Sequence, residues 1–359
     1  MLIHHVLPGE IDGNTTWFYR QNPFEQQETL RQVAFKRQRW PTLEDGRNIR
    51  FPGHIYPHIL PDGYVRLAFY EPLAEAILSY LQDEDIALHT EVLNLKSSQV
   101  ACLNFLFPLR QDTRLASAVL QPFLPGLQEV TEIEFEYTGP PEVTQQLGEP
   151  GSGKRGQNRT SIDTAIFWND QTGRRHITLV EWKYTERSYG ACSAFQSAHK
   201  EDRARCQSLN LARDLNPSRS CLLTTGGRYR SRHYWEYLSA AGISSNSYEN
   251  VSGCPFQGPF YQLMRQFVLA ACLRRLFFPV QVDVISIGFA GNTALKTLPP
   301  QLQPLATGEG KSTIEAWNNT LKGVPLMRHI TVEEMVARLD QVGGVNQGWR
   351  DYLHERYNV

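Results

Sequence analysis

Cysteine is scarce and scattered in this chain of 359 residues. The six cysteines stand at positions 102, 192, 206, 221, 254 and 272, without a C-x-x-C pair or a histidine pair at zinc-ligand spacing. This spacing argues against a disulfide-stapled fold and against a structural zinc site. Several of the cysteines lie in apolar or helical runs, where a free cysteine behaves as a small hydrophobic residue.

Long hydrophobic runs are also missing. No run reaches the length that spans a membrane, and the N-terminal "MLIHHVLPGE" has neither the basic start nor the long apolar stretch of a signal peptide. We therefore expect a reduced, cytoplasmic protein with no membrane partner.

The chain has no excess of charge of either sign, since its formal net charge is −1. Any surface for nucleic acid must therefore come from local clusters of basic residues. Two such clusters are residues 31–40 and the segment 199–233, which contains Arg203, Arg228, Arg230 and Arg232. A solvated surface is the alternative interpretation of either cluster.

The motifs of two common hydrolase classes are absent. No G-x-S-x-G elbow is present, so serine hydrolysis has no support. The loop "GEPGSGK" at 148–154 resembles a phosphate-binding loop, but Arg155 follows where a serine or threonine should bind magnesium. Its flanks also lack the preceding buried strand and the following helix, and we exclude nucleotide hydrolysis.

What the sequence does contain is a regular order of helix and strand patterns. Helices are predicted at 70–82, from Ser97 or Ser98 to the residue before Pro108, at 199–214 and at 258–278; strands are predicted at 128–138, 162–168, 176–184, 220–225 and 281–289. This order predicts an α/β fold with a mixed sheet flanked by helices. No repeat and no obvious linker is present, so one elaborated domain is favoured over two.

Two of the predicted strands carry acids within apolar surroundings. The turn "NDQTG" at 169–173 joins them into an antiparallel hairpin that places Asp163 close to Glu181 and Lys183. Two carboxylates at that separation repel one another, and a divalent cation with oxygen ligands would relieve the repulsion. The alternative is an ordinary cross-strand ion pair at a wet sheet edge.

The pattern Asp163…Glu181-x-Lys183 resembles the PD-(D/E)XK nuclease superfamily, and more narrowly a bacterial family of restriction endonucleases. The collinear matches are "YPHILP" at 56–61, "SSQVACLNFLFPL" at 97–109, "EFEY" at 134–137, "TSID" at 160–163, "VEWKYTE" at 180–186 and "YQLMR" at 261–265. One departure is Ile162, which stands where the superfamily pattern has proline.

This resemblance implies a restriction-endonuclease-like core at 91–290, with an N-terminal extension at 1–90 and a C-terminal extension at 291–359. It also implies cleavage of DNA phosphodiester bonds with Mg²⁺, for which Mn²⁺ should substitute. The implied site residues are Asp163, Glu181 and Glu136 as metal ligands, Lys183 as the catalytic lysine and Gln99 as a hydrogen-bonding neighbour, with Glu134 as an alternative to Glu136.

The implied partner is DNA, held by Arg203, Arg228, Arg230 and Arg232. A homodimer is expected only by analogy with enzymes that cut both strands. A nuclease-like fold that binds nucleic acid without cutting it is the alternative function, although the intact set of two acids and a lysine disfavours it.

Overall fold

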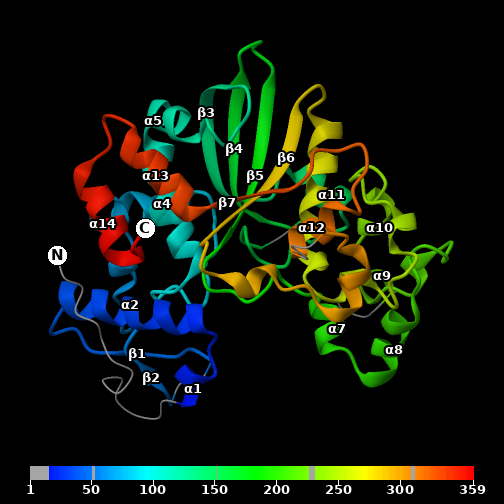
Figure 1. The fold of residues 1–359 in the computed structure, drawn as a ribbon, viewed down its shortest axis with the longest axis horizontal. Helices are drawn as coiled ribbons and strands as arrows, with labels where there is room; N and C mark the ends of the chain where they lie inside the picture. Colours follow the sequence, from blue (N-terminus) through cyan, green and yellow to red (C-terminus); the bar gives the residue numbers. More distant parts are fainter. Residues whose placement is uncertain (1–15, 51–52, 152, 226–230, 309–311) are drawn as a thin grey trace.

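The computed structural model describes residues 16–50, 53–151, 153–225, 231–308 and 312–359. Its centre is a five-stranded mixed sheet in the order β3-β4-β5-β6-β7 (Figure 1). The strands are β3 (Leu127–Tyr137), β4 (Ile162–Asp170), β5 (Arg175–Lys183), β6 (Gln281–Gly288) and β7 (Arg328–Thr331). The first three are antiparallel and the last three run parallel, which confirms the predicted α/β class with a mixed sheet.

The β4–β5 hairpin has the register that the sequence predicted. Thr164 pairs with Val180 and Ala165 with Leu179, so Asp163 lies opposite Glu181. The turn forms because the Asp170 carboxylate accepts hydrogen bonds from the backbone N–H groups of Thr172 and Arg174, at 2.8 and 3.0 Å. A short aspartate turn of this kind fixes the register of the whole hairpin.

One face of the sheet is covered by helices from both ends of the chain. Val180, Trp182 and Tyr184 point into this core. The helices are α2 (Pro23–Arg39), α3 (Ala74–Asp83), α4 (Ser98–Gln111), α5 (Thr113–Leu120), α13 (Val332–Gln341) and α14 (Gln347–Tyr357), which Figure 1 shows on the left. Short α1 (Thr16–Tyr19) precedes α2, and β1 (Gly46–Arg47) pairs with β2 (Ile55–Tyr56) beside it.

The opposite face is covered by one long helix, α11 (Phe260–Leu276), and by a group of short ones. Ile177 and Leu179 point into this second core. The short helices are α6 (Pro141–Gln146), α7 (Ser193–Ser197), α8 (Lys200–Ser208), α9 (Leu222–Thr225), α10 (Tyr234–Tyr237) and α12 (Thr313–Asn318), and α7 to α12 lie on the right of Figure 1. Burial on both faces explains why the middle of β4 and of β5 is largely apolar, with the charged residues toward the strand ends.

Several element predictions need correction. Helix α4 continues through Pro108 to Gln111, the predicted helix at 199–214 is limited to α8, and the run 220–225 forms the short helix α9 instead of a strand. Strand β7 was not predicted, and it lies in the proposed C-terminal extension. The expected boundary at residue 290 therefore falls between two strands of one sheet.

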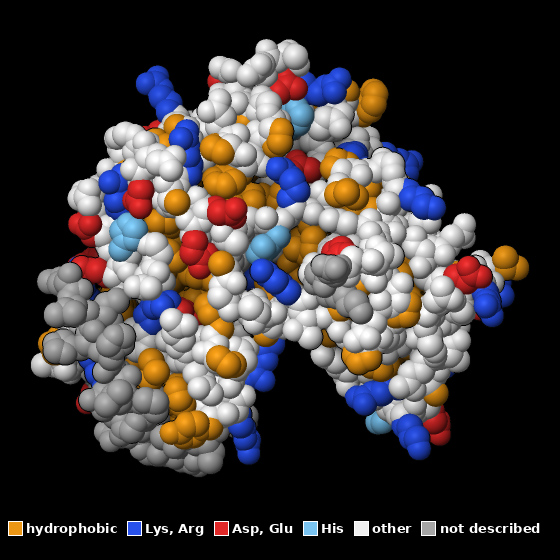
Figure 2. All heavy atoms as spheres, in the orientation of Figure 1, with side chains coloured by type: hydrophobic (Ala, Val, Ile, Leu, Met, Phe, Trp, Pro, Cys, Tyr) orange, Lys and Arg blue, Asp and Glu red, His pale blue; other side chains and the backbone are white. Residues whose placement is uncertain are grey.

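The molecule is hollowed between its two helical sides. Figure 2 shows an open cleft between the left and right halves, with lysine and arginine side chains on both walls. The β4–β5 turn lies at the far end of the sheet, so the start of β4 and the end of β5 point toward this cleft (Figure 1). Of the described helices, none combines the length and the apolar character that crossing a bilayer requires.

Candidate active site

Three acidic residues stand at one level across three neighbouring strands. The pairs Phe135–Thr164 and Tyr137–Ile162 place Glu136 of β3 opposite Asp163 of β4. The β4–β5 register places Asp163 opposite Glu181. Residues that face one another across antiparallel strands have Cβ atoms about 5 Å apart, so this row concentrates negative charge.

Glu136 reaches the row through an unusual backbone conformation. Its φ of +46° lies in the left-handed region, which residues other than glycine rarely adopt. The carboxylate accepts a hydrogen bond from Gln99 Nε2 at 2.8 Å and another from Ser161 Oγ at 2.7 Å. Strained backbone of this kind is found most often at functional sites. The predicted contact of Gln99 with the site is present.

The neighbouring Glu134 is engaged elsewhere. Its carboxylate pairs with the guanidinium of Arg155 at 3.1 Å. Arg155 also donates to the backbone oxygens of Phe135 and Glu136. Of the two glutamates that the sequence left open, Glu136 therefore lies with Asp163 in the same cavity and Glu134 does not.

Asp163 is held by the backbone of the next strand. Its Oδ2 accepts a hydrogen bond from the Trp182 N–H at 2.7 Å. Burial, and next the charge of Glu181, raise the pKa of Asp163 well above its usual value. Without a cation, the site therefore resists ionisation of this carboxyl group.

Glu181 and Lys183 form a buried ion pair at the end of β5, with Nζ and Oε1 2.5 Å apart. Two glutamines of α11 complete the surroundings of Glu181: Gln262 donates to Oε1 at 2.5 Å and Gln266 donates to Oε2. Burial raises the pKa of Glu181, although Lys183 counteracts it. Burial opposes the charge of Lys183, but Glu181, Glu186 and Asp163 outweigh it and raise its pKa, so Lys183 stays protonated.

A cavity of about 490 Å³ opens beside this row, and Gln99, Glu136 and Asp163 line it. Its other lining residues include Lys96, Glu186 and Arg187, which come from the loops that precede α4 and follow β5. Glu186 accepts a hydrogen bond from Ser98 Oγ at 2.5 Å, which ties its loop to the start of α4.

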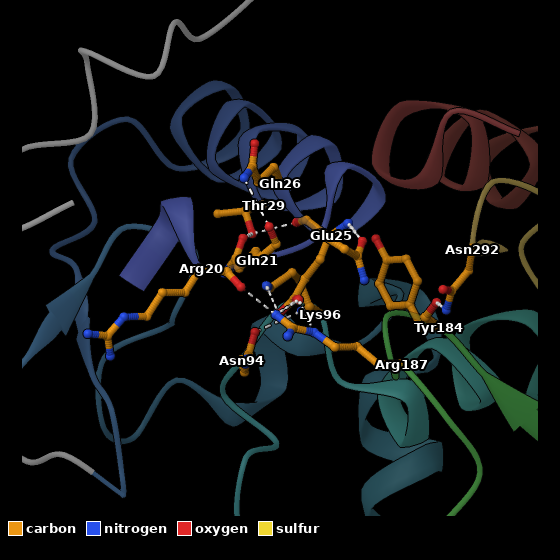
Figure 3. Close-up of polar contacts among 11 residues, drawn as sticks. Arg20, Gln21, Glu25, Gln26, Thr29, Asn94, Lys96, Tyr184, Arg187 and Asn292 are labelled. Atoms are coloured by element: carbon orange, nitrogen blue, oxygen red, sulfur yellow. Dashed lines mark hydrogen bonds and ion pairs between the residues drawn. The ribbon is translucent and has the colours of Figure 1, made fainter. Parts of the chain in front are cut away.

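Lys96 was missed by the sequence analysis. Only 7% of its surface is exposed, and burial lowers the pKa of its ammonium group to about 8. Glu25 of α2 lies 3.7 Å from Lys96 Nζ and 2.9 Å from the guanidinium of Arg187, so three segments meet here (Figure 3). The sequence signal for Lys96 was its position directly before the "SSQ" motif.

The predicted DNA-contacting arginines have different surroundings. Arg203 is exposed on α8 and donates to the backbone oxygen of Phe195 at 3.1 Å. Arg232 is 8% exposed, and its guanidinium donates to the backbone oxygens of Gly148 and Asn158, both at 2.8 Å. The Arg232 side chain thus joins two loops, and its contact with DNA stays a prediction. Arg228 and Arg230 lie outside the described residues.

Two neighbouring carboxylates of the row, but not all three, could bind one Mg²⁺ ion. No three His, Cys, Asp or Glu residues among those described are placed to hold one ion together. Mg²⁺, however, keeps several waters and is usually bound by one or two carboxylates with substrate phosphates. The raised pKa values of Asp163 and Glu181 show that added positive charge would stabilise this pair.

Comparison with known proteins identifies the family of the chain. No curated protein and no solved structure matches the chain significantly. The sequence profile of one family, described as "Restriction Endonuclease associating with ARP", matches residues 30–358. The matched region includes the whole sheet, the row of acids and α11. The chain therefore belongs to this restriction endonuclease family, whose description indicates DNA as the substrate of a nuclease.

Proposed function

We propose that this protein hydrolyses DNA phosphodiester bonds with Mg²⁺, or with Mn²⁺ in its place, and that Asp163, Glu181 and Lys183 form its active site. The observation that carries the proposal is the row of Glu136, Asp163 and Glu181, with Lys183 beside it, in a chain of a restriction endonuclease family. Asp163 and Glu181 would hold the ion, and Glu136 would activate a water near it instead of binding the ion as a third carboxylate. A bound divalent ion supplies positive charge at the phosphate and lowers the pKa of water.

The protein's own groups have separate tasks in this proposal. Lys183 is protonated, and its ammonium group stabilises the negative charge that develops on the phosphate during attack by water. The Trp182 N–H fixes the direction of the Asp163 carboxylate, and Gln99 fixes that of Glu136. The cavity beside them gives room for a backbone phosphate.

The test is cleavage of plasmid and phage DNA in Mg²⁺ and in Mn²⁺ by the wild type, by Lys183→Ala and by Lys322→Ala. Lys183→Ala should lose activity by at least roughly 10²–10³-fold, which is typical when one stabilising group is removed from a transition state. Lys322 is exposed between α12 and β7, outside the basic segments and the site, and serves as the control, with wild-type cleavage expected. DNA binding and the melting temperature are measured for each variant, so that loss of folding is recognised.

Each outcome decides between the functions. Cutting by the wild type and Lys322→Ala alone supports the nuclease, and undiminished cutting by Lys183→Ala would refute the assigned role. If every protein binds DNA and none cuts it, the chain is a nuclease-like protein that binds without cleaving. Sedimentation of the protein with DNA tests whether two copies act together, as cleavage of both strands at one position would require.

A further inference from the structure

Four of the six cysteines meet at one small cavity on the right-hand side of Figure 1. Cys192 precedes α7, Cys206 lies in α8, Cys221 precedes α9 and Cys254 precedes a short helical turn at Pro255–Gln257. All four line the cavity and are buried. Their wide spacing in the sequence had argued against a shared site, and the fold brings them together.

The thiols also lie near one another. Cys254 is within electrostatic range of the other three, and Cys192 is within range of Cys206 and Cys221. The backbone N–H of Cys254 donates to the carbonyl oxygen of Cys206 at 2.7 Å, which joins two of the four segments. Hydrophobic packing alone explains one or two buried cysteines. It does not explain why most of a scarce residue gathers at a single place.

Backbone N–H groups surround the sulfur atoms. Burial raises the pKa of the Cys192, Cys206 and Cys254 thiols, and nearby backbone N–H groups partly counteract it: those of Phe195 and Ala194 at Cys192, that of Leu222 at Cys206 and that of Phe256 at Cys254. Backbone N–H groups beside cysteine sulfur are among the features that tune iron–sulfur centres. The remaining lining is apolar, including Phe195, Leu223 and Met264, and so shields the centre from water.

Zinc sites and iron–sulfur clusters differ in how close together their cysteine ligands must lie. A tetrahedral zinc ion with Zn–S bonds of about 2.3 Å needs its four sulfur atoms within about 4 Å of one another. No described group of cysteines is placed to hold a single ion. An iron–sulfur cluster takes more widely separated cysteines, since iron and sulfide atoms lie between them. We propose that Cys192, Cys206, Cys221 and Cys254 bind an iron–sulfur cluster through their four sulfur atoms.

The proposed cluster would stabilise the fold by joining separate segments of the chain. Among the described residues, the stretch between Lys183 and Phe260 contains only short helices, which lie on the right of Figure 1. A metal centre that joins such segments adds its binding energy to folding. The four cysteines are distributed over the stretch, so one cluster would join its beginning, middle and end. Cluster assembly takes up sulfide and iron ions that already have the oxidation states of the finished cluster; four Fe–S bonds to cysteine form, four S–H bonds break, and the four protons leave to water.

The test begins with the wild-type protein, purified without oxygen and analysed for iron, acid-labile sulfide, zinc and visible absorbance. The proposal expects equal amounts of iron and sulfide, about two or four of each per chain, with a brown colour. Cys206→Ser and Cys221→Ser should lose most of the iron and sulfide. Cys272→Ser should retain both, because Cys272 is equally buried in α11 but does not line the cavity.

Other results would overturn the proposal. About one zinc ion per chain without sulfide would identify a zinc site instead. Protein without any metal, even after reconstitution with iron and sulfide, would show that the four cysteines only pack together. The wild-type measurements decide the question even if a serine variant fails to fold. They do not depend on DNA cleavage, so this proposal and the nuclease function can fail separately.

Discussion

At the scale of single residues, the carboxyl group of Asp163 lies out of water and beside a second acid. Burial and Glu181 both raise its pKa. A carboxyl group whose pKa is raised on folding stabilises the protein at low pH, and this contribution is lost as the pH rises through the folded pKa. At neutral pH and without a cation, the charged form of Asp163 therefore opposes folding.

Asp163→Asn should consequently raise the melting temperature at pH 8 in the presence of a chelator, by roughly 1–2 °C for each kcal/mol of repulsion removed. The asparagine oxygen can still accept the hydrogen bond from Trp182, so little else changes. The gain should vanish near pH 3.5, where both proteins are uncharged at this position. Calorimetry over this pH range measures it, and a lower melting temperature at pH 8 would contradict the account.

Asp170, at the other end of β4, is the matched control. Hydrogen bonds from Thr172 and His176 lower its pKa. A lowered pKa stabilises the protein above the usual carboxyl range and ceases to do so on acidification. Asp170→Asn should therefore lower the melting temperature at pH 8, which is opposite in sign to Asp163→Asn.

At the scale of elements, helix α4 shows how a proline can remain inside a helix. Pro108 has no N–H for the carbonyl oxygen of Asn104, four residues earlier. That buried oxygen instead accepts a hydrogen bond from Trp349 Nε1 of α14 at 2.9 Å. The gap in the hydrogen bonds of α4 is thus the point at which the C-terminal helix attaches.

Trp349→Phe should lower the free energy of unfolding by roughly 1–3 kcal/mol beyond the loss of ring volume, because it leaves the Asn104 oxygen buried and unpaired. Trp317→Phe is the control, since Trp317 is equally buried but its Nε1 has no hydrogen-bond partner among the described residues. Urea unfolding of both variants measures the difference. Equal losses would show that the Trp349 hydrogen bond contributes nothing measurable.

The elements also show how far the sequence predicts the fold. The prediction of the β4–β5 hairpin was correct because the residues alternate in a period of two and a turn sets the register. The end of α4 was wrong because Trp349, which pairs with the freed oxygen, is distant in sequence. The run at 220–225 was wrong because a short apolar segment fits a strand and a buried helix equally well. Strand β7 is only Arg328–Thr331 and depends on β6 for pairing.

The candidate site, like the fold, could be predicted only in part from the sequence. The facing of Asp163 and Glu181 follows from register, and Gln99 and Glu136 followed from family resemblance. The left-handed backbone of Glu136 has no sequence signal, since it results from tertiary contacts around that residue. Lys96 was missed because its meeting with Glu25 joins two segments that only the fold brings together.

At the scale of the whole molecule, the proposed function would have the lysine and arginine side chains beside the cleft bind the phosphate backbone of DNA (Figure 2). Such binding weakens as salt rises, because each neutralised phosphate releases counterions. Arg203→Ala should reduce affinity equally for different DNA sequences and reduce the slope of log affinity against log salt by about one. Fluorescence anisotropy at several salt concentrations measures the slope, and an unchanged slope would remove Arg203 from the interface.

Arg232→Ala is the informative comparison. Its buried guanidinium joins the loops at Gly148 and Asn158, so its loss should lower the melting temperature. The salt dependence of DNA binding should remain as in the wild type.

The glutamines of α11 affect how the binding of a metal ion depends on the binding of DNA. Glu181 already receives hydrogen bonds from Gln262, Gln266 and Lys183, so an ion must compete with protein donors for this carboxylate. A DNA phosphate supplies additional oxygen ligands and offsets that competition. Metal and DNA should therefore bind with positive cooperativity, each increasing the affinity for the other by the same factor. The free protein would hold its ion weakly, and the complete site would assemble only on DNA.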